Sequence, residues 1–142
     1  MLKKLLMLLL ALFLLGGAAQ AEEEYVPPAL PGTWVEFSQS DQDTLYFDAD
    51  SLAYDAAADT AAVLVRTDTA NLKETYVTEY VIDFAAGRIR TSDHGTLYKR
   101  GAARQMRSLA TTLAVTPGTY GEKLAKAVSA HVGRTAAAKS AA

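Results

Sequence analysis

The stretch Glu74-Thr75-Tyr76-Val77-Thr78-Glu79-Tyr80-Val81-Ile82-Asp83-Phe84 decides the fold class, because its side chains alternate in character along the chain. A period of two is typical of a strand that buries one face in an antiparallel sheet. One face carries Tyr76, Tyr80, Ile82 and Phe84, and the other carries Val77, Glu79, Val81 and Asp83. The stretch is therefore predicted to be a strand with its aromatic row in the core.

Shorter strands are predicted on both sides of this stretch. They are expected at residues 33–37, 44–47 and 61–69 upstream, and at 88–91, 96–99 and 113–115 downstream. Ala85-Ala86-Gly87 and Asp93-His94-Gly95 have the composition of turns, and Gly101 to Leu109 is expected to be a loop or a short helix. Consecutive strands joined by turns predict a meander of about six antiparallel strands.

One helix is predicted from about Tyr120 to His131. Thr119 and Glu122 have the spacing of a capping box, and Gly133 is expected to end the helix. Leu124 and Val128 are four residues apart, which places them on one buried face. The predicted fold class is α+β: a single meandering antiparallel sheet with one C-terminal amphipathic helix packed on the face that bears the aromatic row.

The first 21 residues have the features of a secretory signal peptide. Lys3 and Lys4 precede an apolar run, and Ala19-Gln20-Ala21 is a small-x-small site, so cleavage is expected after Ala21. The alternative is an uncleaved N-terminal anchor. The remaining chain is expected to contain a leader rich in Pro and Glu at 22–32, one domain at 33–132 and a flexible alanine-rich tail at 133–142. We expect an exported protein of the periplasm, cell surface or extracellular space, without a membrane anchor after cleavage.

The absence of cysteine and the distribution of charge limit the function further. Without cysteine, the chain has no disulfide, no thiol catalysis and no lipid attached through cysteine. Residues 22–83 contain 14 acidic and two basic residues, whereas residues 84–142 contain ten basic and two acidic residues. A fold that separated these halves would present a cationic face. A fold in which acidic residues of the first half lie next to basic residues of the second is favoured, because sequential strands usually lie side by side.

The chain shows no recognisable catalytic or cofactor motif. No serine lies in a Gly-x-Ser-x-Gly or Ser-x-x-Lys motif, and no phosphate-binding or dinucleotide-binding loop occurs. Asp48 and Asp50 lack the glycine and glutamate of a calcium loop, so no metal site is expected. We expect no enzyme, no cofactor and no catalytic residue. The alternative of a hydrolase without a known motif requires a deep pocket that joins His94 to a carboxylate and a hydroxyl.

Basic residues are the remaining candidate for a binding site. They follow the aromatic strand, and we expect a protein or an anionic polymer as the partner. The alternative is a solvated edge that discourages the addition of another strand. Nucleic acid is not expected, because the exported chain would be net acidic and has no platform of aromatic and basic residues. The candidate partner-binding residues are Arg88, Arg90, Lys99, Arg100, Arg104 and Arg107.

Five short motifs occur in a characteristic order. They are Trp34-Val35, Tyr46 to Leu52, Val63 to Val65, Tyr80 to Asp83, and Val115 to Leu124. In this order they resemble the surface-adhesin protein E family of small exported bacterial proteins, over about residues 33–129. The resemblance implies an antiparallel sheet closed by a C-terminal helix, a surface or envelope location, an association with host adhesion, and no catalytic residues or cofactor.

The chain differs from that family at two positions. Family members commonly carry a cysteine after the Tyr-x-x-Asp strand and another in the last helix, where this chain has Phe84 and Ser129. Packing is expected to replace a disulfide here. We expect a non-enzymatic binding protein of the envelope or surface that engages host-matrix or anionic partners. The alternative is a periplasmic structural or inhibitor-like accessory protein that acts through sheet-edge pairing.

Overall fold

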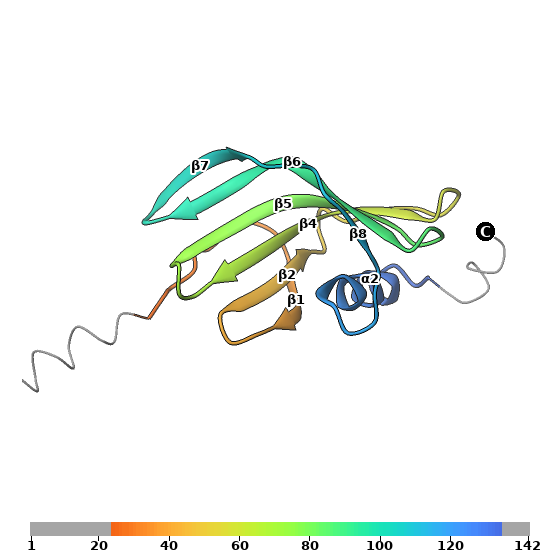
Figure 1. Ribbon diagram of the computed structural model, residues 1–142, viewed down its shortest axis with the longest axis horizontal. Helices are drawn as coiled ribbons and strands as arrows, with labels where there is room; N and C mark the ends of the chain where they lie inside the picture. The colour runs from red at the N-terminus through yellow and green to blue at the C-terminus, as the bar shows by residue number, and fades with distance from the viewer. Residues whose placement is uncertain (1–23, 135–142) are drawn as a thin grey trace, which may run out of the picture.

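The computed structural model describes residues 24–134, which form an open antiparallel sheet and one helix (Figure 1). The predicted signal peptide and its cleavage site lie outside the described residues. The main strands follow one another as β1 (Trp34–Gln39), β2 (Asp43–Asp48), β4 (Thr60–Thr69), β5 (Glu74–Asp83), β6 (Arg88–Lys99) and β7 (Ala102–Arg107). The short β3 (Ala53–Asp55) pairs with β4, β8 (Thr112–Ala114) pairs with β6, and the helix is α2 (Tyr120–His131).

The meandering antiparallel sheet and the C-terminal helix are confirmed, but the sheet has eight strands rather than about six. Residues 102–107 form β7, where a loop or a short helix was predicted. As an edge strand, β7 leaves five of its six side chains exposed, so it lacks the apolar alternation that marks a buried strand. The three-residue β3 and β8 are too short to produce a periodic signal.

The predicted turn at Asp93-His94-Gly95 is also wrong, because β6 continues through it. Gly95 pairs with Thr78 and Thr91 pairs with Tyr80, so the residues of β6 between Thr91 and Gly95 stand opposite Glu79 alone. This irregularity bends β6 without ending it. Segments predicted as two strands therefore form one long curved strand at the top of the sheet (Figure 1).

Helix α2 packs on one face of the sheet, as predicted. Its Leu124 and Val128 are fully buried in the same cluster as Ile82 and Tyr80 of β5. The alternation of β5 is confirmed by its register, which places Tyr80 opposite Val63 of β4. The core therefore lies between α2 and the part of the aromatic row formed by Tyr80, Ile82 and Phe84. We call this sheet face the inner face and the opposite one the outer face.

The capping box at the start of α2 is confirmed in part. The hydroxyl of Thr119 accepts a hydrogen bond from the backbone N–H of Glu122 at 3.4 Å. The side chain of Glu122 accepts from the backbone N–H of Gly118 at 3.3 Å, one residue before the N-cap. Two N–H groups at the helix start are thereby satisfied, as capping requires.

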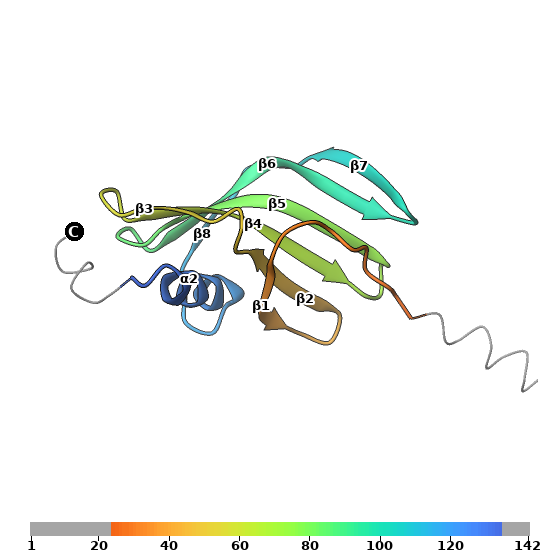
Figure 2. The same ribbon diagram turned by 180° about the vertical axis from the view of Figure 1, so that it is seen from behind.

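Residues 24–32 lie across the outer face (Figure 2). The hydroxyl oxygens of Tyr25 and Thr75 are 2.5 Å apart, and Arg66 Nη2 donates to the carbonyl of Pro28 at 2.9 Å. The guanidinium of Arg66 lies 5.7 Å from the ring centroids of Trp34 and Tyr46. A buried arginine of β4 therefore holds the leader against the sheet.

Tyr76 lies on the inner face of β5 but outside the core cluster. Its phenol packs over Gly95, where an added Cβ would lie 2.5 Å from the phenol oxygen. That oxygen is buried and has no hydrogen-bond partner among residues 24–134. A buried hydroxyl without a partner has a desolvation cost that no hydrogen bond offsets.

We therefore expect Tyr76→Phe to leave the free energy of unfolding unchanged or to raise it by up to about 1 kcal/mol. Urea denaturation measures the change. Tyr54→Phe is the matched control, because the hydroxyl of Tyr54 donates to Asp59 at 2.8 Å, and this variant should lose stability. A clear loss of stability in Tyr76→Phe would show that its hydroxyl has a partner.

Candidate functional site

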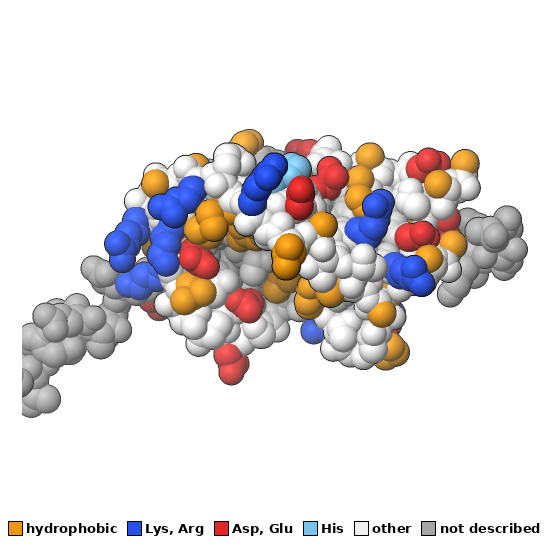
Figure 3. Space-filling view, turned by 45° about the horizontal axis from the view of Figure 1, so that its top comes forward, with side chains coloured by type: hydrophobic (Ala, Val, Ile, Leu, Met, Phe, Trp, Pro, Cys, Tyr) orange, Lys and Arg blue, Asp and Glu red, His pale blue; other side chains and the backbone are white. Residues whose placement is uncertain are grey.

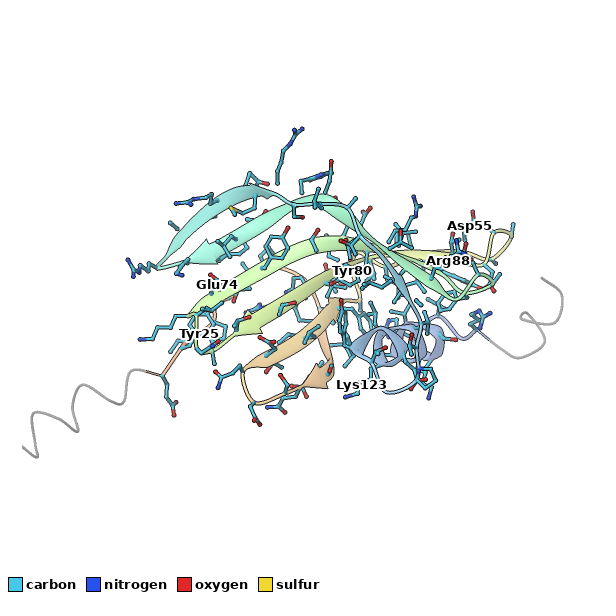
Figure 4. The ribbon with its side chains drawn as sticks, in the orientation of Figure 1. Tyr25, Asp55, Glu74, Tyr80, Arg88 and Lys123 are labelled. Atoms are coloured by element: carbon cyan, nitrogen blue, oxygen red, sulfur yellow. The ribbon has the colours of Figure 1, made fainter. Side chains whose placement is uncertain are left out.

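The six predicted basic residues do not form one patch. Arg88 and Arg90 lie at the start of the twelve-residue β6, and Lys99 lies at its other end. Figure 4 places Arg88 at the end of the sheet opposite Tyr25 and Glu74. They are separated because 88–91 and 96–99 belong to one strand, whereas a turn between them would have folded the two segments together.

Arg107 lies between these two ends, opposite His94 in the β6–β7 register. The Nδ1 atom of His94 is 2.8 Å from Asp93 Oδ1 and 3.2 Å from Ser92 Oγ. The hydrogen bond with His94 lowers the pKa of Asp93. The side chains of His94 and Asp93 are 73% and 62% exposed, so they are not in a deep pocket. Both partners contact the same ring nitrogen, whereas a catalytic triad uses opposite nitrogens.

Lys99, Arg100 and Arg104 do lie at the same end of the sheet. They belong to the β6–β7 hairpin, and Lys73 joins them from the β4–β5 turn, since the register places Glu74 opposite Lys99. Figure 3 shows Lys and Arg side chains gathered at the end where these turns lie. We call these four residues the basic end. Sequence reasoning missed Lys73, because it is one of only two bases in the acidic half of the chain.

Pairing of opposite charges is incomplete at the basic end. The ammonium of Lys99 lies 3.4 Å from Glu74 Oε2. Across the described residues, neither Arg100 nor Arg104 has an ion pair. Arg100 lies in the turn beyond the last residue pair of β5 and β6, so no residue of β5 stands opposite it. Arg104 lies on β7, which contains no acidic residue. Two guanidinium groups therefore remain available to an external anion.

A cavity of about 440 Å³ opens beside the basic end, and we call it the outer slot. The leader forms one wall, and the hydrogen bonds from Tyr25 to Thr75 and from Arg66 to Pro28 hold that wall in place. Tyr98 of β6 supplies a second aromatic side chain. Among residues 24–134, the lining residues are Glu24, Tyr25, Val26, Pro28, Lys73, Tyr98, Lys99, Arg100 and Gly101.

A second hollow of about 360 Å³ lies at the same hairpin. Lys99 and Arg100 line this hollow as well as the outer slot. Its other lining residues are Leu97, Ala102 and Arg104. Lys99 and Arg100 therefore stand between two concave surfaces, and an anion bound by them can contact either one.

A groove of about 430 Å³ also runs along α2, between Phe84 and Lys126. Its charges are partly paired, since Lys126 lies 3.6 Å from Glu122.

No cluster of three or more His, Asp or Glu residues within 24–134 is placed to hold a metal ion. In the same range, no helix is long and apolar enough to cross a membrane. Comparisons with protein-family models, curated proteins and solved structures find no match to this chain.

Proposed function

We propose that this is an exported, non-enzymatic binding protein of the bacterial envelope or surface, related to the surface-adhesin protein E family. The basic end binds carboxylated or sulfated groups of a host-matrix protein or an anionic polymer. The observation that carries this proposal is the convergence of Lys73, Lys99, Arg100 and Arg104 from two turns and one edge strand. Guanidinium groups bind carboxylate and sulfate through two parallel hydrogen bonds.

The second candidate is an accessory protein that pairs with a partner strand through β7. The observation that favours it is that β7 pairs with β6 and with no further strand of the described chain. An exposed edge supplies backbone N–H and C=O groups for such pairing. Because β7 carries Arg104 and Arg107, it would repel a basic partner strand and attract an acidic partner strand.

Charge reversal tests the role of the basic end. Arg100→Glu combined with Arg104→Glu should lower the affinity for heparin by about tenfold or more, because two attractive contacts become repulsive. Surface plasmon resonance with immobilised heparin at fixed salt measures this affinity. The matched control is Arg88→Glu with Arg90→Glu, which makes the same charge change at the other end of β6.

We expect the control to bind heparin almost as well as the unmodified protein. An equal loss in both double variants would mean that net charge alone governs binding. No loss in the Arg100 and Arg104 variant would exclude the basic end as the site. Far-ultraviolet circular dichroism of each variant checks that the sheet is intact.

A further inference from the structure

We propose that the outer slot binds the hydrocarbon chain of an anionic amphiphile, whose headgroup is held by Lys99 and Arg100. This inference deepens the proposed function and rests on the same basic end. It adds anionic amphiphiles as the ligand class, because a purely polar anion would leave the apolar lining of the cavity in contact with water. The shared chemistry is an acyl chain attached to a carboxylate or phosphate headgroup.

The apolar part of the outer slot comes from the leader and from β6. Val26 lines the outer slot and is 83% exposed, so its apolar side chain is open to a ligand. The hydroxyl of Tyr25 is already hydrogen-bonded to Thr75, so this residue offers its ring carbons to a ligand. Pro28 and Tyr98 add further apolar surface. Covering these groups with a hydrocarbon chain removes apolar surface from water.

The cations stand at the border of the same cavity. Lys73, Lys99 and Arg100 all line it, together with one acid, Glu24. The side chain of Lys99 faces Glu74 at 3.4 Å, a long contact that a bound anion can share. Arg100 has no ion pair with any residue of the described range, and its planar fork matches a carboxylate or phosphate. A negative headgroup is therefore favoured over a neutral or positive one.

The size and the rigidity of the outer slot fit a small ligand. Its volume of about 440 Å³ falls within the range of small-molecule sites. The leader wall is fixed in advance by Arg66, whose Nη2 donates to the carbonyl of Pro28 at 2.9 Å. Figure 4 shows Tyr25 of the leader and Glu74 of β5 at the same end of the sheet. A wall held in place before binding avoids the entropy cost of ordering it.

Isothermal titration calorimetry with three ligands tests the proposal. Decanoate, kept below the concentration at which it self-associates, should bind to the protein. Decyltrimethylammonium, which has the same chain length and the opposite charge, should bind about tenfold more weakly or worse. Acetate, which has the headgroup without the chain, should show no measurable heat. Equal binding of decanoate and the cation, or no binding of decanoate, would overturn the proposal.

Two variants with matched exposure locate the ligand. Val26→Ser should weaken decanoate binding about fivefold, because apolar contact area is lost. Leu109→Ser is the control, because Leu109 is 88% exposed and does not line the outer slot. Arg100→Gln should also weaken decanoate binding, and it should strengthen the binding of decyltrimethylammonium, because it removes a like charge from the outer slot. Equal effects of the two serine variants would overturn the assignment to this cavity.

Vesicles distinguish the source of the amphiphile. If the source is a membrane lipid, phosphatidylglycerol vesicles bind the protein in flotation assays, and Val26→Ser weakens this binding. If the source is a free fatty carboxylate, decanoate binds and the vesicles do not. Vesicle binding that Val26→Ser leaves unchanged, without decanoate binding, would overturn the proposal in favour of simple charge attraction.

The outcome is separable from that of the proposed function. Val26→Ser should leave heparin affinity unchanged, because it removes no charge. If heparin binds and decanoate does not, the ligand class is wrong and the basic end remains a site for polymers. If decanoate binds and heparin does not, the polymer partner is wrong and the outer slot remains a site for amphiphiles.

Discussion

Arg134→Ala is expected to lower the free energy of unfolding by about 2 to 3 kcal/mol, because it removes the guanidinium that binds both oxygens of the buried Asp59 carboxylate. Nε and Nη2 of Arg134 each donate to one carboxylate oxygen of Asp59 at 2.6 Å. The side chains of Arg134 and Asp59 are only 9% and 4% exposed. The guanidinium also lies 4.6 Å from the ring centroid of Phe84. One substitution therefore removes two hydrogen bonds, an ion pair and a cation–π contact.

The position of this pair explains why its loss matters for the whole domain. Asp59 precedes β4, and Arg134 follows the end of α2, so the pair ties the end of the helix to the sheet. The hydrogen bond to Asp59 raises the pKa of Arg134, which is consistent with a cation stabilised in the folded state. A chain without cysteine thus holds its helix end by an ion pair as well as by packing.

Urea denaturation at neutral pH measures the effect of Arg134→Ala. Arg134→Lys is the matched control, because it keeps the charge and loses the two-fold hydrogen bonding, so it should lose about half as much stability. A change below about 1 kcal/mol for Arg134→Ala would show that the pair behaves as a solvent-screened surface ion pair.

The elements that could be predicted from sequence are those whose burial is periodic. From Thr78 to Ile82, β5 buries every second residue, and α2 buries Leu124 and Val128 at helical spacing, so local patterns suffice. β7 was missed because both of its faces are largely exposed. The role of Arg134 was missed for another reason. Its partner is 75 residues away, and Arg134 stands after the glycine that ends the helix.

The candidate site also has a part that could be predicted from sequence and a part that could not. Lys99, Arg100 and Arg104 lie close together in sequence, so their grouping was predictable, whereas Arg88 and Arg90 were grouped with them only through the false turn in β6. The apolar half of the outer slot could not be predicted. It exists because Arg66 on β4 holds Pro28, which is 38 residues away, and no local pattern reports such a contact.

Arg66→Met is expected to have the second large effect and to release the leader from the sheet. Arg66 is 7% exposed, its Nε donates to Asp68 Oδ1 at 2.9 Å, and its Nη2 donates to the carbonyl of Pro28. Methionine occupies part of the same volume but supplies no donor, so Asp68 remains buried without its cation. We expect a loss of about 3 kcal/mol in the free energy of unfolding.

A second variant separates the cost of the buried charge from the anchoring of the leader. Arg66→Met combined with Asp68→Leu removes both ions, and replacement of a buried pair by apolar groups often recovers stability. The hydroxyl of Thr75, which donates to Asp68 at 2.6 Å, then loses its acceptor, so recovery should be partial. The carbonyl of Pro28 still lacks its donor in the double variant. The leader should therefore stay detached even where stability returns.

Chymotrypsin cleavage after Tyr25 distinguishes these two effects, because a protease needs an extended and accessible segment. Both variants should be cleaved there faster than the unmodified protein, although the double variant unfolds at a higher urea concentration than the single one. Decanoate binding should fall in both variants, since the leader is one wall of the outer slot. Heparin binding at the basic end should persist, since none of its four cations is changed. Unchanged cleavage in both variants would mean that contacts other than those of Arg66 hold the leader. The hydrogen bond between Tyr25 and Thr75 would then be the contact that keeps this wall of the outer slot in place.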